Sequence, residues 1–232
     1  MRLVFRGILQ DSYSLTYRVE ASAVRSFVPD AFDLVQSDRD AYWNVFISKI
    51  DAMRPAGLPR WCGVDFTIVS HRLLVHAISG TGSNLPGMYP IRTDADPLLA
   101  RIFTDFPFHR SRFEWKTKQN DLMISVDASP SEEGNAFVRL TPERGALYPE
   151  NISIPMNLLN WNPIQQHIQI TEASIAEGTS IEKSVYVHEA HFNIFRELEL
   201  NTSLQCATRI QASEYFVRTG HYVEPARMLT FI

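Results

Sequence analysis

Ser14-Leu15-Thr16-Tyr17-Arg18-Val19 is the stretch that decides the fold, because apolar and polar side chains alternate along it with a period of two. This period is typical of a β-strand with one face turned toward a core. The segment Tyr42–Ser48 repeats the alternation, with Trp43, Val45 and Ile47 on one face. Longer runs rich in β-branched residues cover Val64–His76, Leu122–Ala128 and Val185–Phe195. The sequence therefore predicts several strands.

Few helical segments of crossover length separate these strands. Because a doubly wound or (β/α)₈ fold needs such helices between parallel strands, both folds are disfavoured. We expect a mainly β fold, classed as β-rich α+β, with a closed antiparallel barrel or a sandwich-like sheet and a few short helices. The chain has 232 residues, a length that fits one domain of this class. We therefore expect residues 1–232 to form a single domain.

Two helices are predicted. Ala21–Val28 ends before Pro29, because proline disfavours the helical conformation of the residue that precedes it. The stronger helix covers Pro97–Phe106, with Asp96 as its N-cap and Pro107 at its end. Its expected buried stripe consists of Leu98, Leu99, Ile102, Phe103 and Phe106.

Composition excludes several classes of protein. A net charge of -4 and a pI near 6.0 argue against a nucleic-acid binder, which normally carries a basic face. The two cysteines, Cys62 and Cys206, cannot form a disulfide scaffold and lack the spacing of a zinc site. No apolar stretch is long enough to span a membrane. We therefore expect a cytoplasmic protein without a membrane or nucleic-acid partner.

Two short motifs fail as cofactor or metal sites. Gly80-Thr81-Gly82 lacks the third glycine of a dinucleotide-binding fingerprint. His188 and His191 are three residues apart in a strand-like run, so they point to opposite faces, whereas the metalloprotease motif needs histidines four apart on a helix. The sequence therefore indicates no metal and no cofactor.

A dense polar cluster follows the second predicted helix. His109-Arg110-Ser111-Arg112 carries two guanidinium groups and an imidazole, which together could bind a carboxylate. A solvated connection without a ligand explains the same residues equally well. In the strand that follows, Glu114 and Lys116 alternate with Phe113 and Trp115, so the polar row either faces solvent or lines a polar cavity.

Several segments resemble the acetoacetate decarboxylase-like superfamily. The resemblance extends from about Tyr13 to Met228. The N-terminal match comprises Tyr13, Leu15, Tyr17-Arg18, Ala23-Val24, Val28-Pro29 and Phe32-Asp33-Leu34. The later matches are Asp94–Ala100 and Val187–Ala190, while Met53–Pro59 and Phe106–His109 are closer to an uncharacterised branch of that superfamily. The resemblance implies a closed β-barrel-like fold with an internal polar cavity.

The resemblance does not carry the decarboxylase chemistry with it. In the decarboxylases, two adjacent lysines follow the helix, and one of them forms a Schiff base with the keto acid. An ungapped count from Asp94 places this pair on Arg110 and Ser111, neither of which can form an imine. Lys116 lies further along the next strand, and Lys49 lies on a distant one. We therefore expect no Schiff-base decarboxylation.

The resemblance also suggests a site. Arg18 matches the active-site arginine of the superfamily, and Asp65 stands where the superfamily has a glutamate. We expect His109 and Arg110 to be catalytic, with His109 as the proton carrier near neutral pH. Substrate-binding residues are expected at Arg18, Asp65, Arg112 and Glu114.

The expected ligand is a small anionic or carbonyl-bearing molecule. If the protein is an enzyme, we expect cofactor-free acid–base chemistry of the lyase or isomerase type beside a carbonyl. The alternative is a non-catalytic ligand-binding or sensory module on the same fold, because fold does not fix function. A structural subunit is a third possibility, and the resemblance suggests a homo-oligomer. The sequence leaves the substrate open.

Overall fold

The computed structural model of the chain describes residues 3–78, 83–96, 108–127, 136–145, 155–163, 165 and 167–223. Long strands dominate these residues, and the helices are short. The strands are β1 (Leu3–Glu20), β2 (Asp33–Leu34), β3 (Gln36–Ser37), β4 (Asp40–Pro55), β5 (Val64–Ile78), β6 (Asn84–Ala95), β7 (Phe108–Arg110), β8 (Phe113–Lys118), β9 (Asp121–Val126), β10 (Ala136–Thr141), β11 (Leu158–Asn162), β12 (His167–Ile175), β13 (Ser180–Ser184), β14 (Tyr186–Phe192) and β15 (Ser203–Val223). The helical segments are α1 (Ala21–Val24), η1 (Arg25–Phe27), η2 (Arg60–Cys62) and α2 (Asn193–Glu197).

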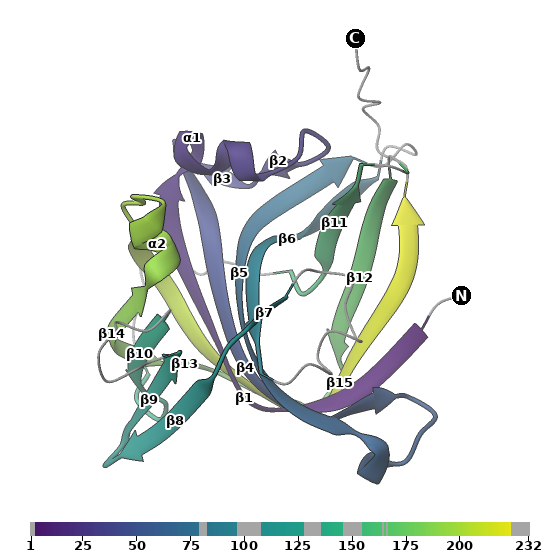
Figure 1. The fold of residues 1–232 in the computed structure, drawn as a ribbon, viewed down its shortest axis with the longest axis vertical. Helices are drawn as coiled ribbons and strands as arrows, with labels where there is room; N and C mark the ends of the chain where they lie inside the picture. Colours follow the sequence, from purple (N-terminus) through teal and green to yellow (C-terminus); the bar gives the residue numbers. More distant parts are fainter. Residues whose placement is uncertain are drawn as a thin grey trace.

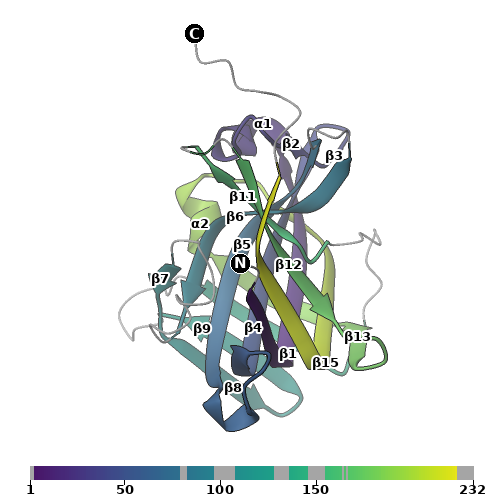
Figure 2. The ribbon, with the colours of Figure 1, turned by 90° about the vertical axis from the view of Figure 1, so that its right-hand side faces the viewer.

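The strands form two sheets. In the 11-stranded main sheet, pairings run from β5 through β4, β1, β15, β12, β11 and β6 and return to β5, so seven strands are joined in a ring. The pairings β11–β6 and β6–β7 are parallel, within an otherwise antiparallel set. The second sheet has four strands in the order β14-β10-β9-β8. Figures 1 and 2 show it outside the ring, beside β1, β4 and β5.

The outer face of β1, β4 and β5 is apolar and packs against the second sheet. Tyr13 contacts Trp115 of β8, and Tyr17 lies edge-to-face with Phe192 at the end of β14. Trp43 and Leu15 are completely buried in the same cluster. This packing follows from the alternation in the sequence, because one face of each long strand contributes the apolar side chains that fill the layer between the sheets.

The opposite face of the same strands points to the inside of the ring. Ala95 of β6 and Val217 of β15 belong to one buried cluster, although no pairing joins their strands. Side chains from these two strands meet only across the inside of the ring. This cluster, here called the Phe5 cluster, contains Phe5, Leu9, Ile50, Met53, Phe66, Ala95, Ala212 and Val217. A smaller one, the Tyr42 cluster, contains Tyr42, Leu74 and Met88.

The structure confirms the mainly β class and most of the predicted elements. The strands expected at Tyr42–Ser48 and Val64–His76 lie within β4 and β5. The helix expected at Ala21–Val28 is present as α1 followed by η1. The run Val185–Phe195 differs from the prediction, because β14 ends at Phe192 and α2 begins at the next residue.

The helix predicted at Pro97–Phe106 lies outside the described residues, so it stays a prediction. The expected burial of its apolar stripe stays a prediction for the same reason.

His71 is buried in the apolar layer between the sheets. It accepts a hydrogen bond from the Trp43 indole, with 3.3 Å between Nε1 and His71 Nδ1, and its ring lies edge-to-face with Phe192 and Phe195. Burial and, to a smaller extent, the charge of Arg92 lower the pKa of His71 from 6.5 to about 3. The imidazole is therefore neutral near pH 7.

This burial predicts a pH-dependent stability. Between about pH 6.5 and 3 the unfolded chain binds a proton at His71 that the folded chain does not. The free energy of unfolding should therefore fall as the pH is lowered through this window, by up to about 1.4 kcal/mol per pH unit. Urea unfolding of the wild type and His71→Phe between pH 7 and 5 measures the difference in slope.

The His71→Phe variant should lose stability less steeply on acidification than the wild type. The matched control is His191→Gln, because the His191 side chain is 71% exposed. Its slope should equal that of the wild type. Parallel slopes for all three proteins would contradict the neutral, buried imidazole.

Candidate functional site

A band of buried polar residues lies on the inner face of the ring, between the Phe5 cluster and the Tyr42 cluster. Paired residues of neighbouring strands share a face, and the register joins Thr16 to Asn44 and Asn44 to Arg72. We call this set the inner polar band: Ser12, Ser14, Thr16, Asn44, Ser48, Ser70, Arg72 and Thr93.

Hydrogen bonds within the band satisfy most of its polar atoms. The Ser12 and Ser48 hydroxyls lie 2.6 Å apart. The Asn44 amide donates to Ser14 Oγ at 2.8 Å and to Thr16 Oγ1 at 3.1 Å. The Asn44 Oδ1 atom is buried without a hydrogen-bond partner in the described part of the chain. Since buried acceptors are normally paired, this oxygen is available to a ligand or a water molecule.

Arg72 is the one cation of the band, and only 7% of its surface is exposed. Its Nε donates to Ser70 Oγ at 2.9 Å, and the guanidinium lies over the Phe46 ring at 4.7 Å. Among the described residues, no carboxylate pairs with Arg72, and neither Nη1 nor Nη2 makes a hydrogen bond. Burial lowers its pKa to about 10, so the group still carries its charge at pH 7. A buried, unpaired charge is costly to fold and is a strong attractor of an anion.

Tyr215 of β15 supplies a second polar group near Arg72. Its ring packs against the Phe5 cluster. Burial raises the pKa of the Tyr215 phenol, and the positive charge of Arg72 lowers it in part. The phenol is therefore neutral at pH 7 and carries a proton that it can donate in a hydrogen bond.

The inner face thus offers complementary groups for a small carboxylate. A guanidinium whose Nη1 and Nη2 atoms make no hydrogen bond to the described residues can present them as the planar donor pair that binds a carboxylate in two-point fashion. A neutral phenol can donate to a carbonyl or a second oxygen. We therefore take the surroundings of Arg72 as the candidate functional site.

The sequence analysis did not identify Arg72 or the inner polar band. A signal was present, because the polar faces of these strands carry Ser, Thr and Asn where a solvated face usually carries Lys and Glu. This composition indicates a polar face that is covered.

The residues predicted for the site are not brought together. Arg18 is half-buried on the inner face near the end of β1, with Nη2 at 3.5 Å from Ser37 Oγ. His109 is exposed on β7. The Arg110 backbone pairs with Ala95 on β6. Across β5 and β4, the register places Ala95 level with Ser12 on β1. Arg18 lies about 20 Å further along β1 at the usual rise per residue. The predicted orientation of the Arg110 side chain lies outside the described residues.

The other predicted binding residues lie on exposed surface. Asp65 is exposed and accepts a hydrogen bond from the Ala52 N–H at 2.7 Å, which stabilises an irregular part of the β4–β5 pair. Arg112 is exposed at the start of β8. Glu114 is exposed and forms a 2.8 Å ion pair with Lys116. The polar residues of β8 were expected either to face solvent or to line a polar cavity. The exposed Glu114 and Lys116 agree with the solvated outer face.

All four lysines of the chain are exposed. They are Lys49, Lys116, Lys118 and Lys183, and each lies in the described part. None of them is therefore placed on the buried inner face beside Arg72. Among the described residues, no three His, Cys, Asp or Glu side chains gather in a way that could hold a metal ion.

A family model for DUF2071, described as an uncharacterized conserved protein, matches residues 9–152, which is more than half of the chain. The chain belongs to this family. No curated protein matches the DUF2071 chain. In its described part, no helix has the length and apolar character needed to cross a membrane.

Solved acetoacetate decarboxylase-like structures share the fold of this DUF2071 protein. An acetoacetate decarboxylase-like enzyme from Sphingomonas wittichii RW1 has a TM-score of 0.59 at 10% identity, over 95% of this chain and 91% of that one. The acetoacetate decarboxylase from Legionella pneumophila has a TM-score of 0.59 at 14% identity, over 95% and 86%. The enduracididine biosynthesis enzyme MppR, complexed with pyruvate, has a TM-score of 0.59 at 10% identity, over 98% and 91%. The expected acetoacetate decarboxylase-like fold is confirmed.

The unpaired state of Arg72 predicts an unusual effect on stability. Replacing Arg72 with methionine removes a buried charge and keeps apolar contact with Phe46, so the free energy of unfolding should rise by about 1–3 kcal/mol. The matched control is Arg92→Met, since Arg92 forms a 3.0 Å ion pair with the buried Asp94. That variant leaves a buried carboxylate unpaired, so its free energy of unfolding should fall by about 3 kcal/mol.

Denaturant unfolding at pH 7 measures both changes. A loss of stability in Arg72→Met similar to that in Arg92→Met would mean that Arg72 has a charged partner, and would contradict the site described above.

Proposed function

We propose that this protein binds a small compound with a carboxylate beside a carbonyl, such as a 2-oxo acid, on the inner face of the ring. The observation that carries the proposal is the buried Arg72 guanidinium, which has no carboxylate partner among the described residues. Arg72 would bind the ligand carboxylate through Nη1 and Nη2. The Tyr215 phenol would donate to the adjacent carbonyl oxygen, and Asn44 Oδ1 would accept a ligand hydroxyl or a bridging water.

A neighbour of the same fold supports this class of ligand. MppR forms a complex with pyruvate, which has a carboxylate next to a carbonyl. At 10% identity the likeness shows the fold alone, so the ligand class rests on the groups around Arg72. Those groups complement both functional groups of a 2-oxo acid.

We further propose that no lysine forms a Schiff base with the ligand. The exposure of Lys49, Lys116, Lys118 and Lys183 supports this proposal, and a guanidinium cannot form an imine because it stays protonated. Any reaction would then be acid–base chemistry beside the carbonyl, of the lyase or isomerase type and without a cofactor. A non-catalytic binding or sensory role on the same site is the alternative.

The proposal also includes the expectations from the sequence on domain organisation, location, self-association and residue roles. We propose one domain over residues 1–232, a cytoplasmic location and self-association into a homo-oligomer. Arg18 would be a second cation on the inner face, nearer its end. The catalytic roles expected for His109 and Arg110 stay predictions, as do the binding roles of Asp65, Arg112 and Glu114.

The central test is calorimetric titration of pyruvate into the wild type and Arg72→Met. Loss of two charged hydrogen bonds at about 1.5–3 kcal/mol each should weaken binding by about a hundredfold or more. Arg60→Met is the control, because Arg60 is exposed on η2, and it should bind pyruvate like the wild type. Equal affinity of the wild type and Arg72→Met would refute the proposed site.

Borohydride treatment in the presence of pyruvate tests the chemistry separately. Intact-mass spectrometry should show no reduced adduct, because no lysine lies on the inner face. Reduced adduct on any lysine, located by peptide mapping, would restore a covalent mechanism and overturn the proposal that the protein works without one.

A further inference from the structure

The turn between β4 and β5 has no role in the proposed 2-oxo acid site. We call its residues 56–62 the β4–β5 tip, and Figures 1 and 2 show it projecting from one end of the molecule. Trp61, on η2, is 84% exposed, and Leu58 is 48% exposed. The Ala56 N–H donates to the carbonyl of the exposed Val4 at 2.9 Å, so the start of β1 lies beside the tip. Several apolar side chains are therefore exposed at this end.

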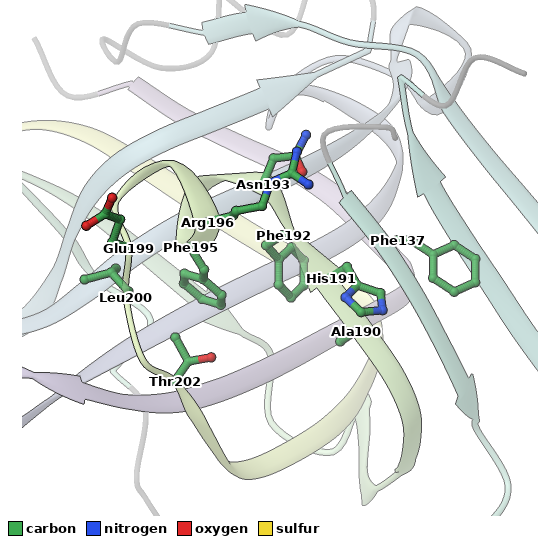
Figure 3. A pocket seen from close by; sticks show the side chains of 10 residues that line it. All are labelled: Phe137, Ala190, His191, Phe192, Asn193, Phe195, Arg196, Glu199, Leu200 and Thr202. Carbon is green, nitrogen blue, oxygen red and sulfur yellow. The ribbon is translucent and has the colours of Figure 1, made fainter. Parts of the chain in front are cut away.

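The aromatic rings beside α2 are covered, in contrast to Trp61. Phe192 and Phe195 line a pocket where α2 follows β14 (Figure 3). Both are buried, and their rings lie edge-to-face with centroids 5.6 Å apart. Among the described residues, no other aromatic ring contacts Trp61. An indole left in water together with neighbouring apolar side chains is typical of a contact surface.

A buried arginine holds the base of the tip. The Arg54 Nε donates to the Leu58 carbonyl at 3.0 Å, and its Nη1 donates to the Ala52 carbonyl at 2.7 Å. The Leu58 N–H donates to the Pro55 carbonyl at 2.9 Å. Gly63 packs so closely on Ala52 that a Cβ atom would lie 2.5 Å from the Ala52 backbone. Because these contacts already fix the backbone, the tip would lose little conformational entropy on binding a partner.

Charged groups of both signs lie near the tip. Burial and the Asp65 carboxylate raise the pKa of Asp51, and Lys49 and Arg60 lower it in part. These three neighbours are therefore close enough to act on Asp51 electrostatically. In the described part of the chain, none of the four forms an ion pair. Two cations and two carboxylates are thus available to a charged partner.

This mixture of charges favours a second copy of the chain over an anionic membrane surface. A membrane surface attracts segments rich in lysine and arginine, whereas Asp51 and Asp65 would be repelled. In a symmetric dimer the same patch meets itself, so each Arg60 can face a carboxylate of the partner. Exposed aromatic rings with charges around them also match the usual composition of protein–protein interfaces.

We propose that two copies of this protein associate through their β4–β5 tips. Trp61 and Leu58 would pack against the tip of the partner, and Arg60 would face the partner's Asp65. This inference rests on the self-association proposed above and names the surface that forms it. Arg72 lies roughly 25 Å along β5 from the first residue of that strand at the usual rise per residue. The interface is therefore separate from the 2-oxo acid site.

Sedimentation velocity over a range of protein concentrations tests the proposal, and the wild type should form a dimer. Trp61→Ala should raise the dissociation constant of the dimer by at least about tenfold, because aromatic anchors dominate such interfaces. Arg60→Glu should also weaken the dimer, since it adds a negative charge beside Asp51 and Asp65, and added salt should partly reverse this loss. The matched control is Tyr186→Ala, because Tyr186 is an exposed ring on β14 of the second sheet. Its dimer should match that of the wild type.

Circular dichroism and pyruvate titration of each variant separate loss of the dimer from loss of the fold or of the ligand site. Trp61→Ala should keep both, because its side chain is exposed. A dimer that persists in Trp61→Ala and Arg60→Glu would overturn the tip as the interface and leave self-association in place. A wild type that stays monomeric would overturn both. A blue shift of Trp61 fluorescence on phosphatidylserine vesicles, without dimer formation, would assign the tip to a membrane surface and equally overturn the proposal.

Discussion

Both faces of β1, β4 and β5 are buried, and this constraint governs the rest of the structure. A strand covered on one side can leave its polar face in water, but here the second sheet covers the outer face and the ring of strands encloses the inner one. Every polar side chain on the inner face must therefore find a partner inside the protein. The hydroxyl and amide pairs between Ser12 and Ser48 and around Asn44 meet this requirement.

Among the described residues, Arg72 does not find a charged partner. Its buried charge therefore connects the stability of the fold to the proposed binding of a ligand. Ser70 and the Phe46 ring satisfy only part of the guanidinium. Proteins commonly sacrifice stability at a functional site, where groups are held ready for a ligand. A bound carboxylate would neutralise the charge and stabilise the fold by mass action.

The fold could be predicted from the sequence far better than the site. The alternation in Ser14–Val19 and in Tyr42–Ser48 indicates which side chains share a face of a strand. It depends only on neighbouring residues in the sequence, and it was enough to predict the β class. Whether a polar face meets solvent or the inside of a ring depends on β15, which pairs with β1 from the other end of the chain. The resemblance therefore led to Asp65, and the polar residues after the second predicted helix led to Arg112 and Glu114. All three are exposed, and neither argument pointed to Arg72.

A crystal structure of the wild type with pyruvate tests the central claim most directly. The account predicts pyruvate on the inner face, with its carboxylate oxygens within hydrogen-bond distance of Arg72 Nη1 and Nη2 and its carbonyl oxygen toward the Tyr215 hydroxyl. Crystals of Arg72→Met grown in the same way should show no pyruvate there. Pyruvate bound elsewhere, or joined covalently to a lysine Nζ, would contradict the account.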